Sequence, residues 1–146
     1  MRKQQTGFTL IELVVVITIL GILAAFAIPR FANLDSQARV SAVTALTGSL
    51  RSAAALAHAE YLAAGTTPST VTMEGQTVTL NNGYPDSNGI QVALQDVSGF
   101  TIASAASTVT FQKNGATTLS SCQVIYTVAS AASSPPTYTG PTTSGC

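Results

Sequence analysis

One uninterrupted apolar segment constrains this chain more than any other feature. Residues 8–28 carry a single charged side chain, Glu12, and as an α-helix these 21 residues would extend about 31 Å, close to the ~30 Å hydrocarbon thickness of a bilayer. The basic residues Arg2 and Lys3 precede the segment and favour an orientation with the N-terminus inside. The sequence therefore predicts a helix that lies in lipid or in a protein bundle.

Three interpretations of this segment are open. A secretory signal peptide would be cleaved after Ala27, but the apolar run is longer than the usual core of about 7–15 residues and contains an ionisable group. A permanent membrane anchor leaves Glu12 as an unexplained cost of a few kcal/mol. In the third interpretation, cleavage falls between Gly7 and Phe8 and the segment stays on the mature protein. Only the third accounts for every feature.

The helical pattern continues beyond Pro29. Residues 31–64 are rich in Ala and Leu and contain no proline, and Gly65 is a suitable helix stop. We therefore expect one helix over residues 8–64, with a polar face on its second half only. The apolar face of that second half recurs at steps of three and four: Val43, Leu46, Leu50, Ala53, Ala57 and Tyr61.

After Gly65 the composition shifts to Thr, Ser, Val and Gly, which is typical of strands and turns. Strands are expected in a hairpin over 70–80 and over 99–103, 107–112 and 122–128. The last of these alternates, with Cys122, Val124, Tyr126 and Val128 on one face. Residues 81–89 are dense in turn formers. Residues 132–146 contain three prolines, which block a strand ladder, so this tail is expected to be irregular.

The two cysteines, Cys122 and Cys146, favour a disulfide formed in an oxidising compartment. Closing the 23-residue loop between them would stabilise the fold by roughly 3.5 kcal/mol in the chain-entropy model. The alternative is a pair of free thiols in a cytosolic protein.

Charge and composition argue against several functions. The chain is neutral, and its side-chain charge is −2 without residues 1–7, so it lacks the basic patch that nucleic-acid binding needs. The only histidine, His58, is expected at a surface or interface rather than on a metal. The sequence has no phosphate-binding loop or cofactor motif, so neither a cofactor nor catalysis is expected.

The sequence GFTLIELVVVITILGILAAFAIPRF closely resembles the N-terminus of type IV pilins and pseudopilins, with Gly7, Phe8, Glu12 and Pro29 at the positions of the family pattern. The resemblance implies that a membrane aspartyl prepilin peptidase cuts after Gly7 and methylates the amine of Phe8. It implies an α+β pilin fold, in which the second half of the helix packs on a four-stranded antiparallel sheet. It also implies a disulfide-closed C-terminal region, a layout that Cys122 and Cys146 match.

The same resemblance implies a domain organisation and a function. The expected parts are a cleaved leader (1–7), a transmembrane and filament-core helix (8–30), an amphipathic helix (31–64) and a β-sheet domain (65–146). The expected protein is a subunit of an extracellular type IVa pilus that supports adhesion or motility and resides in the inner membrane before assembly. The implied partners are other copies in a helical filament, the prepilin peptidase, a platform protein, an assembly ATPase and, with an outer membrane, a secretin.

Two parts of the helix have expected roles in assembly. A carboxylate in hydrocarbon is costly unless it is protonated or paired. After cleavage, Glu12 can pair with the Phe8 amine of its own helix, four residues away, or a neighbouring subunit can bring its Phe8 amine to Glu12 instead. We expect this pair to align incoming subunits, against the alternative that Glu12 only snorkels to the interface. Gly21 and Pro29 weaken the helix by about 1 and 3 kcal/mol relative to Ala. The segment between them is therefore expected to bend or melt on assembly. The alternative is a kink that a membrane helix tolerates.

Other members of the family remain alternatives. NNGYPDSNGI and CQVIYT resemble the mannose-sensitive haemagglutinin type of pilin. A type II secretion pseudopilin shares the N-terminus but usually lacks a disulfide-closed C-terminus, and a minor pilin would be present at few copies. A DNA-uptake pilin would need exposed basic residues, for which only Arg39, Arg51 and Lys113 are candidates.

Overall fold

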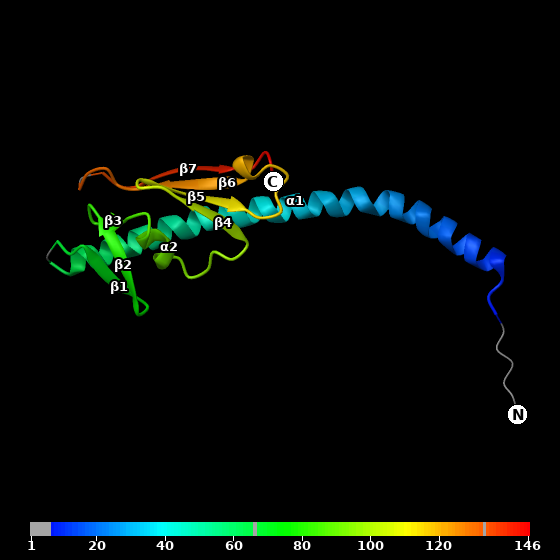
Figure 1. The fold of residues 1–146 in the computed structure, drawn as a ribbon, viewed down its shortest axis with the longest axis horizontal. Helices are drawn as coiled ribbons and strands as arrows, with labels where there is room; N and C mark the ends of the chain where they lie inside the picture. Colours follow the sequence, from blue (N-terminus) through cyan, green and yellow to red (C-terminus); the bar gives the residue numbers. More distant parts are fainter. Residues whose placement is uncertain (1–6, 66, 133) are drawn as a thin grey trace, which may run out of the picture. The chain divides into compact units, whose positions relative to one another are not determined.

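The fold is seen in a computed structural model (Figure 1), which describes residues 7–65, 67–132 and 134–146. The chain divides into two compact units, Met1–Ser36 and Gln37–Cys146. A long N-terminal helix and antiparallel sheets make up the described residues, so the predicted α+β class is confirmed.

The long helix, α1, runs from Leu10 to Ala63. It begins two residues later than predicted and ends one residue earlier. At its C-terminus Gly65 adopts a φ of 63°, and its N–H donates a 3.3 Å hydrogen bond to the carbonyl of Leu62. A residue with positive φ after the last turn is the usual glycine stop of a helix, so the predicted stop at Gly65 is confirmed.

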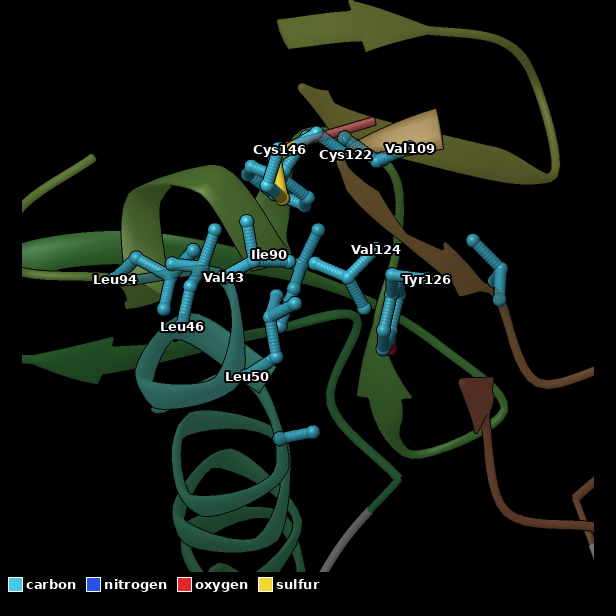
Figure 2. Packing of buried hydrophobic residues seen from close by; sticks show 13 residues of the cluster. Val43, Leu46, Leu50, Ile90, Leu94, Val109, Cys122, Val124, Tyr126 and Cys146 are labelled. Carbon is cyan, nitrogen blue, oxygen red and sulfur yellow. A yellow bond between two sulfur atoms is a disulfide. The ribbon is translucent and has the colours of Figure 1, made fainter. Parts of the chain in front are cut away.

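The second half of α1 supplies one side of the main core (Figure 2). Val43, Leu46 and Leu50 are buried as predicted, and Ala54 is buried whereas the predicted Ala53 is half-buried. These side chains pack against residues of a four-stranded antiparallel sheet and against Ile90 and Leu94. The amphipathic pattern therefore identified the packed face to within one residue.

The four strands of this sheet lie in chain order: β4 (Phe100–Ser104), β5 (Thr108–Lys113), β6 (Gln123–Thr127) and β7 (Thr137–Thr142). The first three match the predicted strands. Strand β6 buries Val124 and Tyr126, and the flanking Cys122 and Val128 are buried too, as the alternation predicted. A 3₁₀ turn, η1 (Leu119–Ser121), connects β5 to β6.

The prediction of an irregular tail is wrong, because residues 137–142 form the edge strand β7. Strand β7 pairs with β6 only, and the register shifts between Gln123 and Ile125. An edge strand needs hydrogen bonds on one side only, so Pro141 is tolerated there although it lacks an N–H. The proline argument excluded a central strand but not an edge strand.

A second, three-stranded sheet was not predicted as a separate unit of structure. It contains β1 (Thr70–Met73), β2 (Gln76–Asn81) and β3 (Tyr84–Pro85), joined in chain order. The expected hairpin over 70–80 is present, and its two turn residues, Glu74 and Gly75, both have positive φ, as a two-residue hairpin turn requires. The five-residue helix α2 (Gly89–Ala93) follows and was not predicted either.

Tyr126 links the two sheets. Its buried hydroxyl donates a 2.7 Å hydrogen bond to the carbonyl of Pro85 in β3, and its ring meets Tyr138 of β7 edge-on with centroids 5.7 Å apart. Burial, followed by the proximity of Tyr138 and Asp86, raises the pKa of the Tyr126 hydroxyl above its ordinary value. The hydroxyl is therefore held neutral in the folded protein.

Replacing Tyr126 with Phe tests this link. Tyr126→Phe should lower the free energy of unfolding by about 1–2 kcal/mol at neutral pH, because the buried carbonyl of Pro85 loses its donor. A folded-state pKa above the unfolded value means that stability is lost as pH rises beyond about 10, and the variant should lose less there. Urea titration with pulse proteolysis of the full chain in detergent measures both effects.

Tyr138→Phe is the matched control. The Tyr138 hydroxyl forms no hydrogen bond within the described residues, so this variant should stay within about 0.5 kcal/mol of the parent at neutral pH. Equal destabilisation by the two substitutions would contradict a specific role for the Tyr126 hydroxyl.

Candidate functional site

The N-terminus of α1 is held by two side chains, Thr9 and Glu12. The backbone N–H and the hydroxyl of Thr9 donate hydrogen bonds of 2.9 and 2.7 Å to Oε2 of Glu12. The N–H of Glu12 donates one of 3.3 Å to the hydroxyl oxygen of Thr9. This reciprocal arrangement is a capping box, which satisfies N–H groups that the first turn leaves without partners. Glu12 therefore has hydrogen-bond donors inside its own helix.

The predicted partner of Glu12, a free amine at Phe8, would exist only in a chain cleaved after Gly7. In the structure Gly7 still precedes Phe8, so the nitrogen at position 8 is a peptide nitrogen and not an amine. The Phe8 ring is exposed. The pairing of Glu12 with a Phe8 amine thus concerns the cleaved protein and stays a prediction.

The apolar segment is unprotected within its own unit. Every side chain from Leu10 to Phe26 is exposed, and an 18-residue window of α1 reaches a mean hydropathy of 2.8. This helix is long and apolar enough to cross a membrane. Because exposed apolar area costs roughly 25 cal/mol per Å² in water, such a surface requires lipid or the apolar surfaces of other chains.

The two weak helix formers lie within continuous helix. The helical assignment of α1 runs without a break through Gly21 and Pro29. A side chain added at Gly21 would meet nothing within 4 Å, so crowding within the described residues does not explain the glycine. Melting between these residues on assembly is untested and stays a prediction.

Cys122 and Cys146 lie at disulfide distance, with their Sγ atoms 1.95 Å apart, and both are buried in the main core. The residues around this pair are held by the backbone as well: the N–H of Thr118 donates to Gly145 at 3.1 Å, and the N–H of Gly145 donates to Ser121 at 2.9 Å. On α1, Nε of Arg39 donates to the backbone oxygen of Cys146. The C-terminal residues are thus fixed to both η1 and α1.

The His58 ring is held by a hydrogen bond and by stacking on tyrosine rings. Its Nδ1–H donates a 2.8 Å hydrogen bond to the carbonyl of Gly83. Its ring stacks on Tyr84, with centroids 4.0 Å apart and planes at 6°, and more loosely on Tyr61 at 5.9 Å. The ring thereby joins α1 to the turn between β2 and β3. The expectation of a surface or interface histidine stays a prediction, because these contacts all lie within one chain.

The second unit contains a hollow with acidic side chains in its lining. A hollow of about 950 Å³ between α1, the β1–β2 hairpin and residues 92–96 includes two carboxylates, Glu74 and Asp96. Gln95 donates to Glu74 at 2.7 Å, and hydrogen bonds from the backbone N–H and then the hydroxyl of Ser98 lower the pKa of Asp96. Among the described residues, no group of three or more His, Cys, Asp and Glu side chains could hold a metal.

Sequence reasoning missed two polar residues that organise the structure. Thr9 completes the capping box, and its signal was present as the spacing Thr-x-x-Glu before an apolar run. The other is Asp86, whose Oδ1 accepts hydrogen bonds from the Thr79 hydroxyl at 2.6 Å and from the N–H groups of Asn88 and Gly89 at 2.9 and 2.6 Å. Only its position before a Ser-Asn-Gly turn hinted at this role.

Comparison with known proteins agrees with the geometry of the N-terminal helix. Residues 2–28 match the family model described as the prokaryotic N-terminal methylation motif, which covers the leader, the capping box and the apolar segment together. This part of the chain is similar to the N-terminal segment of type IV pilins. The matched residues begin before the apolar helix and continue through it.

The N-terminal part of the chain is similar to fimbrial, pilus and secretion-system proteins. It is 51% identical over 53 residues to the type IV major fimbrial protein FimA of Dichelobacter nodosus, covering 36% of this chain and 34% of the relative. It is 55% identical over 51 residues to the type IV narrow pilus major component PilA5 of Thermus thermophilus, covering 35% and 44%. It is 55% identical over 40 residues to the type II secretion system core protein G of Pseudomonas aeruginosa, covering 27% and 28%.

The likeness is confined to part of each protein. The chain spans only about a third to a half of the length of the pilin relatives it matches, so the whole-protein activity of these relatives does not transfer directly. No solved structure matches the chain. The resemblance of residues 81–90 and 122–127 to the mannose-sensitive haemagglutinin type stays a prediction.

Proposed function

We propose that this chain is the structural subunit of an extracellular type IVa pilus. The observation that carries the proposal is the exposed apolar half of α1, which follows a prepilin-type leader within one methylation motif. Its similarity to major fimbrial proteins supports the same function. The role is structural, not enzymatic.

The proposed life cycle follows from the two environments of α1. Residues 8–30 anchor the chain in the inner membrane, and after cleavage at Gly7 they pack in the core of a helical filament of identical subunits. Residues 31–64 and the β-sheet domain of residues 65–146 then form the filament exterior, which supports adhesion or motility. The prepilin peptidase, a platform protein, an assembly ATPase and a secretin are the proposed machinery partners.

Glu12 is proposed to act twice. In the unassembled subunit it caps α1 through Thr9, which provides two hydrogen-bond donors for a carboxylate that hydrocarbon would otherwise leave without partners. After cleavage at Gly7, the positive amine of Phe8 on a neighbouring subunit becomes available as a charge partner. A buried charge pair specifies register more reliably than it adds stability, so the proposed role is alignment of the incoming subunit.

Two substitutions of Glu12 separate these roles. Glu12→Gln keeps a side chain that can cap the helix but removes the charge, whereas Glu12→Val removes both. If charge pairing aligns subunits, both variants should insert and be processed at Gly7, and both should reduce the yield of sheared filaments by about tenfold or more, which corresponds to ~1.4 kcal/mol per subunit addition. Immunoblots of sheared and cell-bound fractions measure the yield.

Thr9→Val is the matched control, because it removes the capping hydroxyl and keeps the charge. Its filament yield should stay within about twofold of the parent if the charge is what matters. Normal assembly of Glu12→Gln together with failure of Thr9→Val would show that Glu12 acts only as a helix cap.

The segment between Gly21 and Pro29 is proposed to lose helical hydrogen bonds in the filament. Both residues weaken helix, and α1 is continuous here before assembly. Hydrogen exchange should therefore show backbone amides of residues 22–28 that are protected in the detergent-solubilised subunit and exchange faster in sheared filaments. Unchanged or greater protection in filaments would favour a tolerated kink.

A pseudopilin of a type II secretion system is the second candidate, favoured by the similarity to core protein G of Pseudomonas aeruginosa. The cysteine pair at the C-terminal region argues for the pilus, since pseudopilins usually lack this closure. Loss of protein secretion with intact piliation after gene deletion would select the pseudopilin. Few copies per sheared fibre would instead indicate a minor pilin.

A further inference from the structure

The sequence contains three Asn-Gly pairs, at residues 82–83, 88–89 and 114–115. Asparagine followed by glycine is chemically labile, because the glycine nitrogen can attack the side-chain amide of the asparagine without hindrance from a neighbouring β-carbon. The reaction requires a mobile backbone and a glycine N–H that is free to react. The three pairs differ in the exposure of the glycine and in how closely other atoms pack around it.

The first two pairs are held by the fold. The side-chain amide of Asn82 donates a 2.9 Å hydrogen bond to the carbonyl of Ala129, and Gly83 is buried, with its carbonyl bound by His58. In the second pair, the buried Gly89 donates its N–H to Asp86 at 2.6 Å. A β-carbon at Gly89 would lie 2.0 Å from the carbonyl oxygen of Thr79, which shows how closely this backbone is packed.

The third pair, Asn114 and Gly115, is exposed to solvent. Asn114 and Gly115 are both exposed in the turn that follows β5, and a β-carbon at Gly115 would meet nothing within 4 Å. The N–H of Asn114 donates a 3.0 Å hydrogen bond to the carbonyl of Gly99, but within the described residues the N–H of Gly115 donates none, and the bond from the N–H of Ala116 to Lys113 is long at 3.4 Å. The glycine nitrogen of this pair is therefore both exposed and without a hydrogen bond among the described residues.

One contact also favours attack at this site. The hydroxyl of Thr101 donates a 2.7 Å hydrogen bond to Oδ1 of Asn114. When a nucleophile adds to the side-chain carbonyl, negative charge develops on that oxygen, and a donor already in place stabilises it. The nucleophile and the activated carbonyl thus belong to adjacent residues of one exposed turn.

We propose that Asn114-Gly115 is a site of spontaneous deamidation in the folded protein. The nitrogen of Gly115 gives up its proton and bonds to Cγ of Asn114, the Cγ–Nδ2 bond breaks, and ammonia leaves. Water then opens the resulting succinimide at either carbonyl, which produces an aspartyl or an isoaspartyl linkage at position 114. Each event adds one negative charge beside Lys113 on a sparsely charged surface.

Digestion with trypsin separates Asn114 from the other two sites. Cleavage after Arg51 and Lys113 places Asn82 and Asn88 on a peptide of residues 52–113 and Asn114 on a peptide of residues 114–146, which contains no other asparagine. The full chain in detergent is incubated at mildly alkaline pH, then reduced, digested and analysed by mass spectrometry. Deamidation at Asn114 should be about tenfold or more faster than at Asn82 or Asn88, because the fold protects the other two.

Two controls test the role of the structure. In reduced protein unfolded in guanidinium, the three sites should deamidate at similar rates, since all share the Asn-Gly sequence. Asn114→Gln should abolish the mass gain of the 114–146 peptide in folded protein and leave the rates at Asn82 and Asn88 unchanged. Equal rates at the three sites in the folded protein, or a slower rate at Asn114 than at Asn88, would overturn the proposal.

Discussion

The apolar half of α1 requires a surrounding that its own compact unit does not supply within the described residues. Its side chains are exposed on every side of the helix, and an apolar surface of this kind is stable in lipid or against other apolar helices. In the proposed function, the same surface serves first as a membrane anchor and later as a filament core. Transfer between the two environments exchanges one apolar contact for another, which makes assembly from a membrane pool energetically reasonable.

Glu12, the single acid of residues 8–28, fits both environments for different reasons. Thr9 donates twice to the Glu12 carboxylate at the start of α1, so the group is not without hydrogen bonds in the unassembled chain. In the proposed mechanism, a charge partner for Glu12 appears only after cleavage creates an amine at Phe8. Capping by Thr9 and pairing with the amine compete for the same oxygens, and the proposed assembly step replaces the first with the second or combines them.

The sequence predicted those elements that depend on local pattern. Periodicity predicted the long helix, its buried face at Val43, Leu46 and Leu50, and the alternation of buried residues in β6. Turn chemistry predicted the hairpin at Glu74. The edge strand β7 was not predicted because it depends on pairing with β6. The helix α2 was not predicted because it depends on the hydrogen bonds that Asp86 accepts at its start. The capping box has a local signal, the Thr-x-x-Glu spacing of Thr9 and Glu12, but the same carboxylate also suits a charge pair, so the spacing alone does not distinguish the two roles.

Cleavage before the apolar helix rather than within or after it is the central claim. Mass analysis of the N-terminus of protein sheared from cells tests it most directly. Polymeric material that begins with a methylated Phe8 is the predicted result, because the helix must then be present in the filament. Sheared protein that begins at Ile28 would contradict the claim, since the apolar segment would then have been removed as a signal peptide.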